Sequence, residues 1–130
     1  MTAVDTNVLV RVLTGDDARQ TKAARALFSM EQIWISRTVL LETDWVLGRL
    51  YGFEQNRIGE AFTHLLGLPN VNVEEEEAVA AALALTRHGI EFSDALHLSA
   101  RPPGARFVSF DKKLVSRARR AGIAGVAGIA

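Results

Sequence analysis

Four acidic residues stand where an apolar segment ends or a helix is expected to begin, and their side chains suggest chemistry on phosphate. They are Asp5, Glu42, Asp94 and Asp111. A carboxylate beside apolar neighbours loses hydration unless a partner compensates for it. Four carboxylates in one pocket repel each other, so such a pocket needs a cation. We therefore predict a site for a hard divalent metal ion and cleavage of a phosphodiester.

The elements that must position these acids are short apolar segments alternating with longer helical patterns. The pattern predicts strands over residues 2–4, 32–35, 71–73, 106–109 and 123–126. It predicts helices over residues 7–13, 16–30, 38–51, 54–66, 74–87, 92–100 and 112–120, with Asp16 as the cap of the second. This alternation favours an α/β fold, a three-layer α/β/α sandwich with a mainly parallel central sheet, in a single domain over residues 1–130.

The predicted sheet explains how acids distant in sequence could meet. Ligands of parallel α/β sheets bind beyond the carboxyl ends of the strands. Asp5 and Asp111 each end a strand and precede a helix, while Glu42 and Asp94 would project from helices toward the same rim. We therefore expect all four acids to gather at one edge of the sheet.

Composition narrows the function further. The chain has 130 residues, is 48% hydrophobic and contains no cysteine, which excludes disulfides, thiolate metal sites and cysteine nucleophiles. The first residues lack the basic region of a signal peptide, and the longest apolar run, residues 78–85, is too short to span a bilayer. We expect a cytoplasmic protein without a membrane partner. The Ala/Gly-rich segment from Ala121 is expected to be partly frayed.

The net charge is zero, but the charges are unevenly distributed. Residues 101–120 carry one acid, Asp111, and seven basic residues, namely Arg101, Arg106, Lys112, Lys113, Arg117, Arg119 and Arg120. This basic segment could contact the phosphates of a nucleic acid. A solvated amphipathic helix explains the same pattern.

Four short motifs resemble those of PIN-domain ribonucleases, in particular the VapC toxin subgroup. They are DTNVLV at 5–10, LETDWVL at 41–47, FSDAL at 92–96 and SFD at 109–111, and together they extend over almost the whole chain. The resemblance implies a metal-dependent RNA endonuclease, usually the toxin of a toxin–antitoxin pair. It also implies a homodimer, a small VapB-type antitoxin that covers the active site, and transfer or ribosomal RNA as substrate.

Carried over by position, the resemblance makes the four acids catalytic. Asp5 and Asp94 would bind Mg²⁺ or Mn²⁺, Glu42 would order a metal-bound water or act as a ligand, and Asp111 would complete the site, at a second metal ion. The family often has another acid two residues after the fourth motif's Asp. This chain has Lys113 there, which puts the second ion in doubt and offers a phosphate contact.

Neighbouring polar side chains are candidates for supporting the acids or touching substrate. They are Thr6, Asn7, Ser93, His97 and Ser109. His97 follows Asp94 by three residues and shares its helical face, where we expect it to pack and orient that carboxylate. Asp44 is expected to be a solvated helical acid. Each of the four acids taken alone could equally be a helix cap or a solvated side chain.

Other functions compatible with the pattern are a non-toxin PIN-type RNA-processing nuclease, another magnesium-dependent phosphate enzyme, a receiver-like signalling domain, and an inactive binding module. A receiver needs an acidic pair after its first strand, but Thr6 follows Asp5. All four acids are present, so the sequence does not indicate an inactive module.

Overall fold

The strands are short, all parallel, and divided between two sheets. The computed structural model describes residues 1–129. Strands β1 (Thr2–Ala3), β2 (Ile33–Ile35) and β3 (Val71–Val73) form one sheet in the order β1-β2-β3, and β4 (Phe107–Ser109) and β5 (Val126–Gly128) form the other. The strand pairs β1–β2, β2–β3 and β4–β5 are all parallel.

Helices connect the strands and make up most of the chain. They are α1 (Thr6–Thr14), α2 (Ala18–Met30), α3 (Arg37–Arg49), α4 (Gln55–Leu66), α5 (Glu76–Thr86), α6 (Phe92–Ala100) and α7 (Lys112–Arg120). The predicted α/β class is therefore confirmed: the molecule is helical with a small parallel sheet. The predictions for α6 and α7 match the observed bounds residue for residue.

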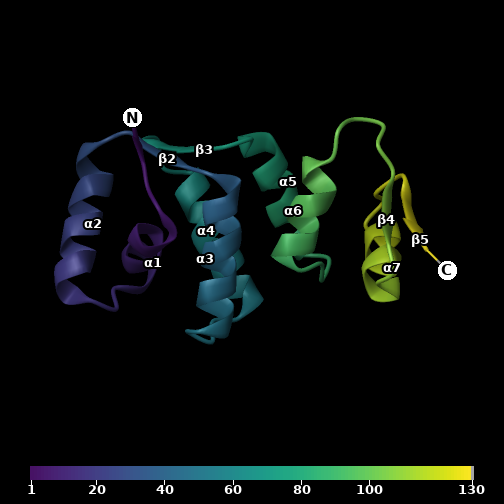
Figure 1. Ribbon diagram of the computed structural model, residues 1–130, viewed down its shortest axis with the longest axis horizontal. Coiled ribbons are helices and arrows are strands. Elements are labelled where there is room, and N and C mark those ends of the chain that lie inside the picture. The colour runs from purple at the N-terminus through teal and green to yellow at the C-terminus, as the bar shows by residue number, and fades with distance from the viewer. Residues whose placement is uncertain (130) are drawn as a thin grey trace.

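The expectation of one continuous sheet is not met. Within residues 1–129, β1 pairs with β2 but not with β4. Figure 1 shows β1 on one side of the helices α3 to α6, and β4 with α7 and β5 on the other. The apolar pattern identifies a strand, but the partner of that strand is decided by tertiary contacts that the pattern does not contain.

The hydrophobic core surrounds β2, which joins the other two strands of its sheet. Ile33 and Ile35 are completely buried. The sequence of a strand in a parallel sheet is a continuous run of apolar residues when helices cover both faces of the sheet. Further along the core, the rings of Phe62 from α4 and Phe92 from α6 meet edge to face, with centroids 5.3 Å apart. This packing fixes the start of α6, the helix that carries Asp94.

Side-chain caps fix where several helices begin. Ser36 accepts a hydrogen bond from the Val39 amide at 3.1 Å and starts α3. The predicted cap of α2 is wrong by one residue: Asp17 accepts from the Gln20 amide at 2.9 Å. Asp16 instead accepts the hydroxyl of Tyr51 at 2.9 Å. Adjacent aspartates are equally good caps by residue type, so contacts outside the helix decide between them.

Most other predicted boundaries differ from the structure by one or two residues, and two of the differences have a clear physical reason. The fifth helix begins at Glu76 rather than at Glu74, because Glu75 adopts a left-handed conformation with φ of 51° and Glu74 accepts the Arg37 amide. The last strand covers residues 126–128 rather than 123–126, because Gly125, with φ of 73°, turns the chain just before it. Strand β5 pairs with β4, so the tail is ordered there, and Ala130 lies outside the described residues.

A search of the helices over residues 1–129 finds none whose length and apolar character would let it cross a bilayer.

A buried threonine yields a test of the core. Thr43 of α3 is fully buried, and its hydroxyl lacks a hydrogen-bond partner among residues 1–129. Thr43→Val should raise the free energy of unfolding by about 1 kcal/mol, because a methyl group replaces an unsatisfied hydroxyl. Urea denaturation measures this change. Thr21→Val is the matched control: the Thr21 hydroxyl donates to the Arg11 carbonyl at 3.4 Å, so its loss should destabilise. A loss of stability in Thr43→Val would contradict the prediction.

Candidate active site

The structure links the first two motifs through a hydrogen bond between α1 and α3. Asp5 follows β1, is exposed, and caps α1 by accepting the Val8 amide at 3.1 Å. Thr6, the next residue, is buried, and its hydroxyl donates to Oε1 of Glu42. Thr6 therefore holds the Glu42 carboxylate close to the start of α1. Its supporting role in a catalytic site stays a prediction. We call Asp5, Thr6 and Glu42 the first acidic group.

The third and fourth motifs form a second acidic group. Glu91, Asp94 and Asp111 line a hollow of about 250 Å³, together with Gly89, Ile90, Lys113, Leu114 and Arg117. Glu91 immediately precedes α6, and Asp111 immediately precedes α7. Asp111 caps α7 by accepting the amides of Lys113 at 3.0 Å and Leu114 at 3.1 Å. The helix start therefore fixes the position of this carboxylate.

The second acidic group is electrostatically strained. Loss of hydration raises the pKa of Asp94, the nearby charges of Glu91 and Asp111 raise it further, and His97 acts in the opposite direction. Carboxylates that repel one another in this way favour a bound proton or a bound cation. The donor chemistry of this group therefore suits a hard divalent ion, which prefers carboxylate oxygens.

The two groups do not merge into one metal site in this conformation. Among residues 1–129, no three acidic or histidine side chains are placed to hold one metal ion. The expected gathering of all four acids at one edge is therefore not observed. Asp5 follows a strand of the first sheet and Asp111 follows a strand of the second, so the two carboxyl ends are not adjacent. The geometry of one chain does not fit a complete metal centre, and the roles assigned to the four acids stay predictions.

The predicted supporting residues are distributed between the same groups. The hydroxyl oxygen of Ser109 accepts the amide of Asp111 at 3.0 Å, so it shapes the turn between β4 and α7. The backbone of Lys113 donates to Asp111, and its side chain borders the same hollow. Asn7 lies beside Asp5 in a different hollow of about 450 Å³ between α1 and α2. His97 is exposed, so the packing role expected for it is wrong, although its charge does reach Asp94.

Sequence reasoning missed the contribution of Glu91 and misjudged Asp44. Asp44 is half-buried, and burial raises its pKa. A hydrogen bond from Gln55 at 3.2 Å lowers this pKa, whereas Glu91 raises it. Ser93 borders the same hollow as Asp44 and Glu91. A signal for Glu91 was present: it precedes Asp94 by three residues, which places two acids close together at the start of one helix.

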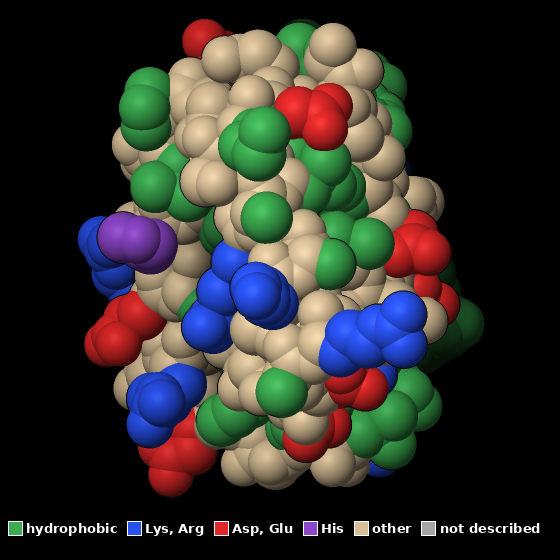
Figure 2. All heavy atoms as spheres, turned by 90° about the vertical axis from the view of Figure 1, so that its left-hand side faces the viewer, with side chains coloured by type: hydrophobic (Ala, Val, Ile, Leu, Met, Phe, Trp, Pro, Cys, Tyr) green, Lys and Arg blue, Asp and Glu red, His purple; other side chains and the backbone are tan. Residues whose placement is uncertain are grey.

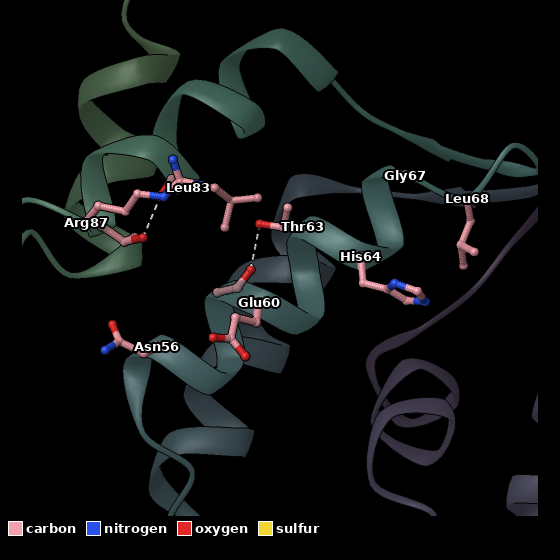
Figure 3. Close-up of a pocket in the computed structure, with 10 residues that line it drawn as sticks. Asn56, Glu60, Thr63, His64, Gly67, Leu68, Leu83 and Arg87 are labelled. Carbon is pink, nitrogen blue, oxygen red and sulfur yellow. Dashed lines mark hydrogen bonds between the residues drawn. The ribbon is translucent and has the colours of Figure 1, made fainter.

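Other surface features are separate from the acids. A hollow of about 810 Å³ lies between α4 and α5. Figure 3 shows Glu60, Thr63 and His64 on one side of it and Arg87 on the other. It contains none of the four motif acids. The end of the molecule beside α2 carries basic, acidic and hydrophobic side chains in mixture, with basic ones across its middle (Figure 2). Neither feature supplies carboxylates for a metal ion.

Comparison with protein-family models identifies the family. Residues 2–120 match the PIN domain model, and the chain therefore belongs to the PIN domain family. PIN domains typically act as metal-dependent nucleases and generally use divalent metal ions. Comparisons with curated proteins and with solved structures give no match. All four motif acids lie within the matched region.

The raised pKa of Asp44 gives a pH-dependent test. Its ionised form is less favourable in the folded chain than in the unfolded chain, so it lowers the free energy of unfolding at neutral pH. Asp44→Asn should therefore stabilise the protein at about pH 7. The gain should vanish as the pH falls below the ordinary value of 3.8, where both states are protonated. Urea denaturation at about pH 7 and about pH 3 measures the difference.

The control for this test is Glu60→Gln, at an exposed position of α4. It also removes one negative charge, but from an exposed carboxylate that has lost little hydration. It should therefore change the free energy of unfolding little at either pH. An equal gain from Asp44→Asn at both pH values would contradict the electrostatic explanation.

Proposed function

We propose that this PIN domain is a divalent-metal-dependent RNA endonuclease that acts as the toxin of a toxin–antitoxin pair. The observation that carries the proposal is the second acidic group: Asp94 has a raised pKa and shares a hollow with Glu91 and Asp111, inside a chain of a nuclease family. Mutual repulsion among carboxylates lowers the stability of the fold. A bound divalent cation would relieve this repulsion, and a metal-dependent nuclease needs the carboxylates to bind that cation.

The proposal assigns each group a task. Asp5 and Asp94 would hold the metal ion in a conformation that brings the two acidic groups together, with Mg²⁺ or Mn²⁺ as the proposed cofactor, and Glu42 and Asp111 would complete the catalytic set. Thr6 keeps Glu42 oriented through its hydroxyl, and Ser109 shapes the turn that presents Asp111. Lys113 borders the acidic hollow, where its charge can meet a phosphate of the RNA.

The proposed partners follow from the charge pattern and the motif resemblance. The basic residues between Arg101 and Arg120 supply contacts for a polyanion, and transfer or ribosomal RNA is the proposed substrate class. A VapB-type antitoxin would cover the site, and the active form would be a homodimer that works in the cytoplasm. The LETDWVL and FSDAL motifs support the toxin subgroup over an RNA-processing nuclease.

Cleavage assays test the enzyme directly. Purified protein without a partner should cut RNA with Mg²⁺ or Mn²⁺ and stop when a chelator is added. Asp94→Asn should reduce the rate at least about 100-fold, because a metal ion contributes several kcal/mol to such a transition state. Glu60→Gln, in a hollow that contains none of the motif acids, should retain the wild-type rate. Full cleavage by folded Asp94→Asn, or cleavage that persists in chelator, would contradict the site.

Expression in bacteria tests the toxin role separately. Induction of the wild-type chain should arrest growth, because RNA cleavage stops protein synthesis. Asp94→Asn at an equal expression level should not arrest it, and a co-expressed antitoxin should restore growth of cells with the wild-type chain. Viable counts after induction measure the effect. Normal growth of cells that contain demonstrably active protein would favour the RNA-processing nuclease instead.

A further inference from the structure

Helix α1 carries a positive charge that no acid of the described chain neutralises. Arg11 lies in the last turn of this helix. Within residues 1–129, the one ion pair joins Arg37 to Glu74, so the guanidinium of Arg11 is without a carboxylate partner. Its charge is therefore available to an anion from outside the chain.

Two uncharged side chains hold Arg11 in place. Its Nε donates to Oε1 of Gln20 at 2.8 Å, and its Nη1 donates to the hydroxyl oxygen of Tyr51 at 3.3 Å. The Tyr51 hydroxyl donates in turn to Asp16 at 2.9 Å, so this acid meets the tyrosine rather than the guanidinium. Gln20 of α2 and Tyr51, which follows α3, therefore fix the plane of the guanidinium without cancelling its charge.

The guanidinium of Arg11 keeps donors for a ligand. A guanidinium has five N–H groups in one rigid plane. Two of them are used here, and among residues 1–129 the others, which include both hydrogens of Nη2, have no acceptor. Neighbouring N–H groups of this kind match two oxygens of a phosphate. Because the side chain is already oriented, little conformational entropy is lost when an anion binds.

Arg11 borders a hollow between α1 and α2 that Asp5 also lines. The hollow has a volume of about 450 Å³. Helices α1 and α2 lie side by side at the end of the molecule that holds β1 (Figure 1). Asn7 and Gln20 add polar groups to the lining, and Leu27 of α2 contributes to its apolar side. A nucleotide has the same two-part character, with a charged phosphate and a base face that stacks on apolar groups.

The hollow connects Arg11 with the carboxylate of Asp5. Arg11 follows Asp5 by six residues, which corresponds to about 9 Å along a helix axis. Asn7 and Arg11 are four residues apart and therefore share one face of α1. A strand that runs from Asp5 along α1 meets the amide of Asn7 first and the guanidinium of Arg11 next.

We propose that Arg11 binds a phosphate of the RNA substrate beside the one that is cleaved, and that Gln20 and Tyr51 are positioning residues for Arg11. The choice of RNA as ligand rests on the proposed function, whereas the anion site rests on the contacts of Arg11 alone. A phosphate held there fixes the register of the strand relative to Asp5. The nucleoside attached to that phosphate lies along the apolar side of the hollow.

A purely structural role for Arg11 explains the same contacts, because Arg11 links α1 to α2 and to the segment after α3. Gln20→Glu separates the two roles. It places a carboxylate beside the guanidinium, so the melting temperature should stay the same or rise. The new carboxylate also neutralises the charge that a phosphate needs, so the affinity for RNA should fall. A structural role alone predicts an unchanged affinity.

Fluorescence anisotropy measures this affinity with a labelled single strand of RNA of about twelve nucleotides. All proteins carry Asp94→Asn to prevent cleavage, and Mg²⁺ is present. Gln20→Glu should weaken binding about tenfold. The matched control is Gln32→Glu, because Gln32 is also exposed and precedes β2, at the opposite end of the parallel strands from Asp5. It adds the same charge and should change the affinity less than about twofold.

Salt dependence tests whether Arg11 itself meets a phosphate. Each such contact to a single strand adds about 0.7 to the slope of log affinity against log salt, so Arg11→Gln should lower the slope by about 0.7. Arg19→Gln removes a charge from an exposed position of α2 outside the hollow and should keep the slope. Arg11→Lys should keep the slope but bind more weakly, because an ammonium lacks the planar set of donors.

Three results would overturn the assignment. One is a folded Arg11→Gln protein with unchanged affinity and unchanged salt slope. Another is a Gln20→Glu protein that binds RNA as tightly as the parent, which would leave Arg11 with a structural role only. The third is equal affinity for a glutamate peptide of the same charge, which would assign the hollow to an acidic peptide instead.

A separate cleavage assay distinguishes this inference from the proposed function. RNA binding that depends on Arg11, in a wild-type protein that cuts no RNA, would contradict the nuclease and support the phosphate site. RNA cleavage by Arg11→Gln at the wild-type kcat/KM would contradict the phosphate site and support the nuclease.

Discussion

Backbone hydrogen bonding between parallel strands determines where the acids of this protein can lie. A carboxylate that directly follows a strand is positioned by the neighbours of that strand, because parallel strands end at the same edge. The pairing of β1 with β2 and β3 places Asp5, and the pairing of β4 with β5 places Asp111. The two ladders are separate, and so are the two acidic groups. Helix packing then adds Glu42 to the first group and Asp94 to the second.

Of the four motif acids, Asp94 lowers the stability of the fold that holds it, because its pKa is raised. The other three carboxylates have hydrogen-bond donors: Asp5 and Asp111 each accept backbone amides at a helix start, and Glu42 accepts a threonine hydroxyl. Among residues 1–129, no hydrogen bond reaches the carboxylate of Asp94, and the charge of His97 offsets only part of the rise in its pKa. Strain that concentrates on one acid of a motif is typical of a functional site, where binding rather than folding supplies the missing partner.

Local features of this chain follow from its sequence, and non-local ones do not. The helix after Asp111 was predictable because an aspartate cap is followed by apolar residues at helical spacing, and the strand at residues 71–73 because buried valines flank an asparagine. The choice of Asp17 over Asp16 depended on a contact with Tyr51, a side chain far along the sequence. The lack of pairing between β1 and β4 is non-local in the same sense.

The candidate site also has features that the sequence predicts and features that depend on tertiary contacts. Four motifs identified the acids, because residue type and spacing can be read directly from the sequence. The involvement of Glu91 with both Asp44 and Asp94 could only be seen once α3 and α6 were packed together. The sequence also led us to expect all four acids at one edge of a sheet. That expectation assumed that β1, β2 and β3 form a single sheet with β4 and β5, whereas these strands form two sheets.

Residues 1–100 contain fourteen acidic and eight basic side chains, and residues 101–130 contain one acidic and seven basic ones, so this neutral protein has an electric dipole. Zero net charge alone would leave an approaching polyanion without guidance at long range. A dipole instead rotates the molecule during approach, so that the basic segment around α7 leads and the acidic segment trails. Physiological salt limits this guidance to roughly 8 Å, so orientation is set in the last moments before contact.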